Sequence, residues 1–254
     1  MLTPFNPNLP VIIQCDSSKN AIGCTLLQNN KPVAFASRSL NNSECEWAQI
    51  EKELLAVSFS CIKFHNYIYG HQDVIIYSDH LPLISIINKP MCKIINNRIR
   101  RLRLKLLIYQ FQLKYMPGKH MYIADYLSRS GAQKHTEEDI TMNDVVHCVG
   151  TKEISFSKER LEEFQTETAK DDTLKQVKQC LIDGWPKSVN YLGELQHYFK
   201  KKNDITLENG LLYLGNRIIV PFKLKRYILT TLHESHLGTN KIIQTANDFF
   251  IGLQ

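Results

Sequence analysis

The first part of the chain begins with short apolar runs and then changes to a helical period. Apolar runs over 11–16, 22–28 and 32–38 are separated by short stretches rich in Ser, Asn, Gln and Lys, which predicts a meander of three antiparallel strands. From about Glu46 to Tyr67 the apolar positions recur with a period near 3.6 residues. This period predicts one long amphipathic helix.

The next elements continue to interleave strands with helices. The pattern predicts a buried strand at 74–79, a short helix at 83–87, a basic helix at 97–109, a strand at 111–115 and a last short helix at 122–128. Strands that come first, followed by interleaved helices, are typical of an α/β domain. We therefore expect a mixed sheet flanked by helices.

A polar stretch separates this domain from a second region. Residues 131–155 carry an acidic run and little periodicity, so we place a linker there, between a domain at 1–130 and a region at 156–254. The second region predicts helices, a hairpin that turns at 208–210 and a further strand at 218–220. We expect it to be smaller and mostly helical, with one β-hairpin.

Composition narrows the class of protein. The chain has 254 residues, of which 43% are hydrophobic, enough to bury at least one sizeable core. No apolar run approaches the roughly 18 residues of a membrane span, so we expect no membrane partner and a cytoplasmic or nuclear location. The seven cysteines include no Cys-x-x-Cys pair. Reduced structural thiols fit this spacing better than a disulfide framework.

The positive charge is concentrated in the first half. The net charge is +6, with +7 within residues 1–129 and −1 in the remainder, which favours a polyanionic partner for the first domain. Within the predicted basic helix, apolar positions keep a core stripe while basic side chains surround it. A solvated helix face is the simpler interpretation of such a run, but a one-signed cluster favours phosphate contacts. The candidates are Arg98, Arg100, Arg101, Arg103 and Lys105.

Two of the predicted strands end on an aspartate. Asp16 closes the first strand and Asp79 closes the strand at 74–79. If these strands lie side by side, their carboxylates come close together, and like charges at that spacing favour a bound cation.

Further carboxylates lie on the predicted helices. On a helical wheel Glu53 borders the apolar stripe of the long helix, whereas Glu51 lies further round and is expected to be a solvated acid or a helix cap. Asp125 lies in the last short helix. Clustered carboxylates without His or Cys favour Mg²⁺ or Mn²⁺ over Zn²⁺, and two such ions catalyse phosphodiester hydrolysis in known enzymes.

Several motifs, in their order and spacing, resemble the ribonuclease H domain of gypsy-type LTR retrotransposon Pol polyproteins. They are Asp16-Ser17-Ser18 with Gly23, the run 32–38, Glu51-Lys52-Glu53-Leu54-Leu55-Ala56, Ser78-Asp79-His80-Leu81-Pro82-Leu83, and Pro117-Gly118-Lys119 leading to the run 124–129. Ser17 departs from the family pattern, in which Ala is commoner.

The resemblance implies an RNase H fold and cleavage of the RNA strand of an RNA/DNA hybrid with two Mg²⁺ ions. It implies Asp16, Glu53, Asp79 and Asp125 as the catalytic and metal-binding acids. It also implies a reverse transcriptase polymerase domain as a possible partner. The motifs of a polymerase or of an integrase core are not in this sequence, so we expect an internal segment of a Pol polyprotein. The alternative is an inactive, truncated relic that still binds nucleic acid.

The end of the chain resembles the start of another module. His233 and His236, followed by Gly238 and Lys241, resemble the opening of the His-His-Cys-Cys zinc module of retroelement integrases. A structural zinc needs four ligands, and no cysteine follows Cys180. We therefore expect a truncated zinc site that does not bind Zn²⁺ stably.

Overall fold

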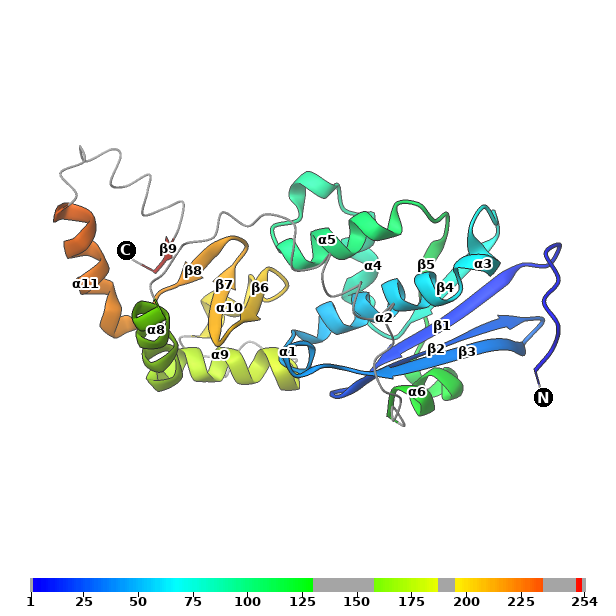
Figure 1. Cartoon of the computed structure of the whole chain (residues 1–254), viewed down its shortest axis with the longest axis horizontal. Coiled ribbons are helices and arrows are strands. Elements are labelled where there is room, and N and C mark those ends of the chain that lie inside the picture. The colour runs from blue at the N-terminus through cyan, green and yellow to red at the C-terminus, as the bar shows by residue number, and fades with distance from the viewer. Residues whose placement is uncertain (1, 130–157, 187–194, 235–249, 253–254) are drawn as a thin grey trace. The chain divides into compact units, whose positions relative to one another are not determined.

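The computed structural model describes residues 2–129, 158–186, 195–234 and 250–252, without the side chains of 158 and 231–234 (Figure 1). Its contacts divide the chain into two compact units. The first comprises Met1–Cys45, Gln49–Ile94 and Arg98–Val149, and the second comprises Glu46–Ala48, Ile95–Asn97 and Gly150–Gln254. The expected linker at 131–155 lies outside the described residues.

The first unit is built on a five-stranded mixed sheet with strand order β3-β2-β1-β4-β5. The strands are β1 (Val11–Ser17), β2 (Ala21–Gln28), β3 (Lys31–Ser39), β4 (Val74–Ser78) and β5 (Gln112–Tyr115). β1 to β3 form the predicted antiparallel meander, while β4 and β5 run parallel to β1. Asn29 and Asn30, both with positive φ, close the two-residue turn between β2 and β3.

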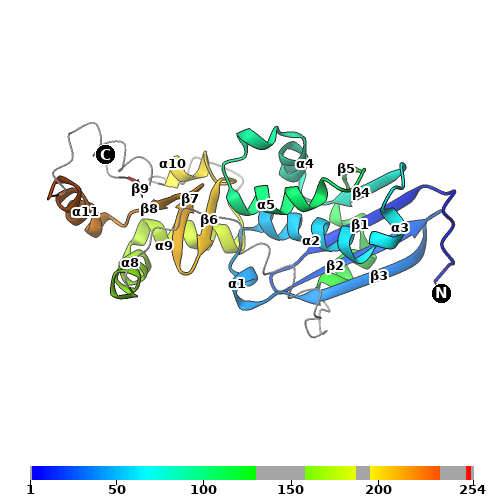
Figure 2. The same cartoon turned by 45° about the horizontal axis from the view of Figure 1, so that its top comes forward.

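Helices cover both faces of this sheet. α2 (Gln49–Lys63), α4 (Leu81–Asn88) and α5 (Asn97–Leu106) lie on one face, and α6 (Tyr122–Arg129) lies on the other (Figures 1 and 2). Every residue of α2 from Ile50 to Cys61 is buried, because the helix lies between the sheet and the other helices of its face. The mixed sheet with flanking helices confirms the predicted α/β fold class.

The predicted helix from 46 to 67 is wrong as a single element. The structure has α1 (Asn42–Cys45), α2 and α3 (His65–Ile68) instead. Phe64, with φ −100° and ψ 18°, departs from helical geometry between α2 and α3. The apolar period continues across these breaks because buried residues such as Trp47 and Phe64 also lie between the helices. Periodicity alone therefore could not show them.

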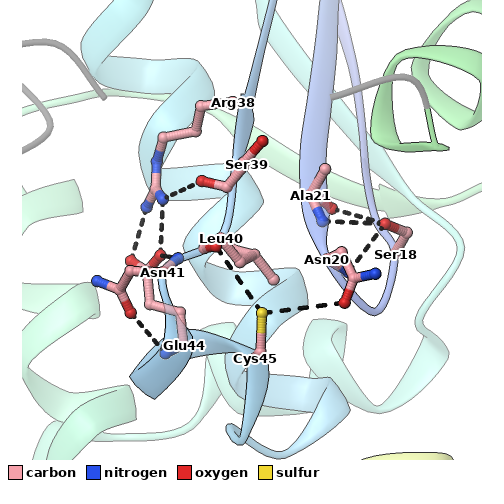
Figure 3. A network of polar contacts seen from close by, with 9 residues as sticks. All are labelled: Ser18, Asn20, Ala21, Arg38, Ser39, Leu40, Asn41, Glu44 and Cys45. Atoms are coloured by element: carbon pink, nitrogen blue, oxygen red, sulfur yellow. Dashed lines mark hydrogen bonds and ion pairs between the residues drawn. The ribbon is translucent and has the colours of Figure 1, made fainter. Parts of the chain in front are cut away.

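A buried ion pair fixes the junction between β3 and α1 (Figure 3). The two terminal nitrogens of Arg38 donate to the two carboxylate oxygens of Glu44, each at 2.7 Å. Glu44 also accepts from the backbone N–H of Asn41, whose side chain accepts in return from the backbone N–H of Glu44. This reciprocal cap satisfies two donors at the start of the helix. It anchors the segment that leads toward α2.

The second unit contains a small sheet with strand order β6-β7-β8-β9, formed by β6 (Ile205–Glu208), β7 (Leu211–Leu214), β8 (Arg217–Ile219) and β9 (Phe250–Ile251). Asn209 and Gly210, both with positive φ, form the predicted hairpin turn between β6 and β7. The helices are α8 (Lys158–Lys170), α9 (Asp172–Asp183), α10 (Gln196–Phe199) and α11 (Phe222–Glu234).

The core of this unit joins two of its helices to the sheet. Phe164 of α8 and Ile228 of α11 pack with Leu211, Ile218 and Val220 from the sheet region. The side chains of His233 and His236, the expected truncated zinc site, lie outside the described residues.

The described residues also bear on membrane-spanning helices and on the state of the cysteines. Within the described residues, no helix combines the length and apolar character needed to cross a membrane. Six cysteines belong to the described part, and all six are free thiols. Cys15, Cys24 and Cys61 are buried, which agrees with the predicted structural role.

Candidate active site

The register of two parallel strands brings the first two acids together. β1 and β4 pair with Gln14 opposite Tyr77, so Asp16 and Asp79 each follow two residues beyond a matched pair. Both strands end at the same edge of the sheet. This is the juxtaposition that the two apolar runs ending on aspartate predicted.

Glu53 completes a group of three carboxylates. Asp16, Glu53 and Asp79 each offer an oxygen, and these three atoms lie within 4.8 Å of one another. Asp16 and Glu53 are buried, whereas Asp79 is exposed, so the cluster opens toward solvent at Asp79. The predicted preference for Glu53 over Glu51 agrees with this placement.

The environment resists ionisation of these acids. Burial is the main cause that raises the pKa of Glu53 from 4.5 to about 8, followed by the charges of Asp16 and Asp79. Burial also raises the pKa of Asp16, and burial followed by the charge of Asp16 raises that of Asp79. A divalent cation would offset both the repulsion and the desolvation. An all-oxygen donor set fits Mg²⁺ or Mn²⁺.

Asp125 lies outside this group of three, although its charge contributes to the raised pKa of Asp16 and of Asp79. Its side chain is 40% exposed, and its Oδ1 accepts from Arg129 Nη2 at 2.7 Å. The fourth predicted acid is therefore a partly exposed neighbour of the other three, held by its own ion pair.

Hydrogen bonds hold Glu53 in place. Ser17 Oγ donates to Glu53 Oε1 at 2.7 Å, and Gln49 Nε2 donates to the same oxygen at 2.8 Å. Gln49 Nε2 also donates to Ser17 Oγ at 3.0 Å. Sequence reasoning missed these supporting roles. The available signals were the unusual Ser17 and the position of Gln49 one helical turn before Glu53.

Gly118 leaves room beside the exposed acid. A Cβ at this position would lie 2.9 Å from Asp79 Oδ2, closer than ordinary contact. The Pro-Gly turn before α6 therefore places bare backbone against the carboxylate.

The structure changes the interpretation of the basic helix. Arg98 was predicted to contact nucleic acid, but its side chain is only 7% exposed and its Nη1 donates to Glu51 Oε2 at 2.8 Å. Glu51, expected to be solvated, has a fully buried side chain. Both expectations are wrong for the same reason: α5 packs on the face of α2 that carries Glu51, so the two charges neutralise each other.

The other basic residues of α5 remain partly exposed: Arg100, Arg101, Arg103 and Lys105. Arg100 donates to the carbonyl of Ile94, and Arg103 donates to the carbonyls of Ile86 and Lys89. Partial burial lowers the pKa of Lys105. These four residues keep a basic surface on α5.

Comparison with known proteins finds relatives for the part of the chain that carries the three clustered acids. Residues 6–109 match the RNase H-like domain found in reverse transcriptase. The chain is 35% identical over 160 residues to the retrovirus-related Pol polyprotein from transposon 297 of Drosophila melanogaster, a match that covers 59% of this chain and 14% of the relative. It is 32% identical over 120 residues to the Pol polyprotein from transposon gypsy of the same organism, covering 47% of this chain and 11% of the relative.

The chain thus spans about a seventh or less of the length of these curated relatives. Among solved structures, LC11-RNase H1 in complex with an RNA/DNA hybrid is 12% identical, with a TM-score of 0.38 and coverage of 48% of this chain and 95% of that chain. The TM-score is too low to carry any argument. The sequence matches support a fragment of a retrotransposon Pol polyprotein, with a match to the RNase H-like domain of reverse transcriptase at residues 6–109.

Proposed function

We propose that the first unit is a ribonuclease H that hydrolyses the RNA strand of an RNA/DNA hybrid by two-metal-ion catalysis. The observation that carries the proposal is the group of three carboxylates, Asp16, Glu53 and Asp79, with oxygens within 4.8 Å of one another. The family match supplies the reaction class, and the site supplies a donor set that suits hard divalent cations.

Each acid has a distinct part in this proposal. Asp16 and Glu53 would hold cations from the buried side, and Asp79 would hold them from the side that is open to solvent. Asp125 adds a fourth carboxylate beside this group. Bound Mg²⁺ ions would supply activation of a water molecule and stabilisation of the leaving oxygen. Ser17 and Gln49 keep Glu53 oriented for this role.

The basic surface of α5 would hold the hybrid. Arg100, Arg101, Arg103 and Lys105 are partly exposed and would contact phosphates, which fixes the position of the substrate without reading its sequence. We therefore expect binding to weaken steeply with salt. Replacing Lys105 by Ala should reduce the slope of log K against log salt by about one. A polymerase domain of the same polyprotein is the proposed partner in the cytoplasm or nucleus.

The deciding experiment is cleavage of a labelled RNA strand within a hybrid by the purified chain. Cleavage is expected with Mg²⁺ and not with EDTA, and Asp79→Asn should lower the rate by orders of magnitude. Asp73→Asn is the matched control, because Asp73 is an exposed acid just before the other end of the same strand.

The outcomes separate this proposal from its rival. Loss of cleavage with EDTA and with Asp79→Asn, but not with Asp73→Asn, supports the nuclease. Salt-dependent hybrid binding by a folded chain that cleaves nothing would replace it with the inactive relic.

A further inference from the structure

A buried serine on α6 contacts the buried aspartate of the site. Ser128 lies in the last turn of α6, and its side chain is fully buried. Its Oγ donates to Asp16 Oδ2 at 2.5 Å, across 112 residues of sequence. The proposed cation-binding group does not include this residue, so the contact needs its own explanation.

A hydrogen bond from Ser18 and the close approach of Gly23 to α6 fix Ser128 where it lies. Its backbone carbonyl accepts from Ser18 Oγ at 2.6 Å, and Ser18 Oγ also bonds within its own turn, to Ala21 (Figure 3). A Cβ added to Gly23 would lie 2.5 Å from the backbone nitrogen of Ser128 and 2.7 Å from the Ala124 carbonyl oxygen. Only glycine lets α6 approach β2 so closely. The hydroxyl is therefore held against Asp16 by the packing of the whole helix.

The chemistry of the contact favours an ordering role. A serine hydroxyl carries one proton, and Ser128 Oγ has two acceptors within reach, Asp16 Oδ2 and the Asp125 carbonyl oxygen at 2.9 Å. An ionised carboxylate is the stronger acceptor. A bond to Oδ2 restricts rotation of the carboxylate and leaves Oδ1 available to a cation.

We propose that Ser128 is a positioning residue, which orients the Asp16 carboxylate for cation binding and links that orientation to the docking of α6. The same helix carries Asp125, so one docked element sets the geometry of two of the four acids. An effect of Ser128 on hybrid cleavage rests on the proposed function, whereas its effect on cation affinity does not.

The test measures Mn²⁺ affinity by calorimetry, without nucleic acid, for the unmutated chain, Ser128→Ala, Ser128→Cys and Asp16→Asn. Loss of a hydrogen bond that orients a ligand costs about 10–100-fold in metal affinity, so Ser128→Ala should weaken Mn²⁺ binding at least about tenfold. Ser128→Cys keeps the size with a weaker donor and should fall between. Ser60→Ala is the matched control, because Ser60 Oγ is also buried but donates to the Val57 carbonyl within α2.

Thermal unfolding in EDTA shows whether each variant is folded. Ser128→Ala that binds Mn²⁺ within twofold of the unmutated chain would overturn the proposal. If that variant does not fold, Ser128→Cys decides by the same criterion. A weakening equal to that of Ser60→Ala would also overturn it, because a general loss of packing would then explain the effect. A chain that binds Mn²⁺ through Asp16 yet cleaves no hybrid would remove the proposed function and leave the positioning role in place.

Discussion

Arg98 of α5 and Glu51 of α2 form a buried ion pair, with Arg98 Nη1 donating to Glu51 Oε2 at 2.8 Å and side chains 7% and 0% exposed. Two charges removed from water together are stable only as a pair. The contact therefore ties the basic helix to the helix that carries Glu53. It also explains how two residues with strongly polar side chains occupy the interior of this unit.

Replacing one partner of this pair should destabilise the first unit more than replacing both partners. Arg98→Met leaves the Glu51 carboxylate buried without compensation and should cost about 3–5 kcal/mol in the free energy of unfolding. The double variant Glu51→Leu with Arg98→Met should recover most of that loss. Urea unfolding of the three chains measures the difference. A double variant as unstable as Arg98→Met alone would show that the pair is not the source of the effect.

The pH dependence of stability should report on Glu53. Its pKa is raised from 4.5 to about 8, so between these values the folded chain holds more protons at Glu53 than the unfolded chain. This contribution makes the free energy of unfolding fall as pH rises through that window. In EDTA, Glu53→Gln removes the contribution and should gain stability relative to the unmutated chain between pH 5 and pH 8.

Thermal unfolding across that range measures the difference between the two chains, so that effects of titrating groups not coupled to Glu53 cancel. Mg²⁺ should stabilise the unmutated chain more than Glu53→Gln, because the cation binds only where its carboxylates are intact. A stability difference that is flat from pH 5 to pH 8 would contradict the prediction.

The four acids should differ in their effect on cleavage. Asp125 is paired with Arg129 and lies outside the group of three, so Asp125→Asn should cost less in the cleavage rate than Asp79→Asn. Single-turnover cleavage of a hybrid at saturating Mg²⁺ compares them. Arg129→Ala is a useful companion, since it removes a mostly exposed ion pair worth less than about 1 kcal/mol. Equal losses of cleavage rate in Asp125→Asn and Asp79→Asn would contradict the prediction, because Asp125 would then contribute as much as Asp79.

One aspartate in the second unit should matter for its stability. Asp171 Oδ1 accepts from the backbone N–H groups of Thr173 and Leu174 at the start of α9, and its Oδ2 accepts from the N–H of Phe222 at the start of α11. Asp171→Ala removes all three hydrogen bonds and should cost about 1–2 kcal/mol in the free energy of unfolding. Its neighbour Asp172 is 91% exposed, so Asp172→Ala is the matched control and should change stability by less than about 0.5 kcal/mol.

Hydrogen exchange of the backbone amides of β6 and β7 measures the stability of the second unit. Faster exchange in Asp171→Ala than in Asp172→Ala is the expected result. Equal exchange in the two variants would show that the double cap carries no stability.

The sequence by itself determined the sheet meander, the two strands that end on Asp16 and Asp79, and the choice of Glu53 over Glu51. These follow from local period and spacing, because a strand or helix imposes its own repeat on the residues that it buries. The hairpin turn at Asn209-Gly210 could be predicted for the same reason, since few residues adopt a positive φ. Strand ends and helix faces therefore located three acids of the candidate site.

Only the tertiary structure decided what surrounds them. Three contacts join elements far apart along the chain: the pairing of Arg98 with Glu51, the bond of Ser17 to Glu53, and the bond of Ser128 to Asp16. A single sequence does not show whether a charged residue stays exposed or is neutralised by a residue far away along the chain. Packing of α5 and α6 against the two faces of the sheet settles which charges are buried and which remain exposed to a substrate.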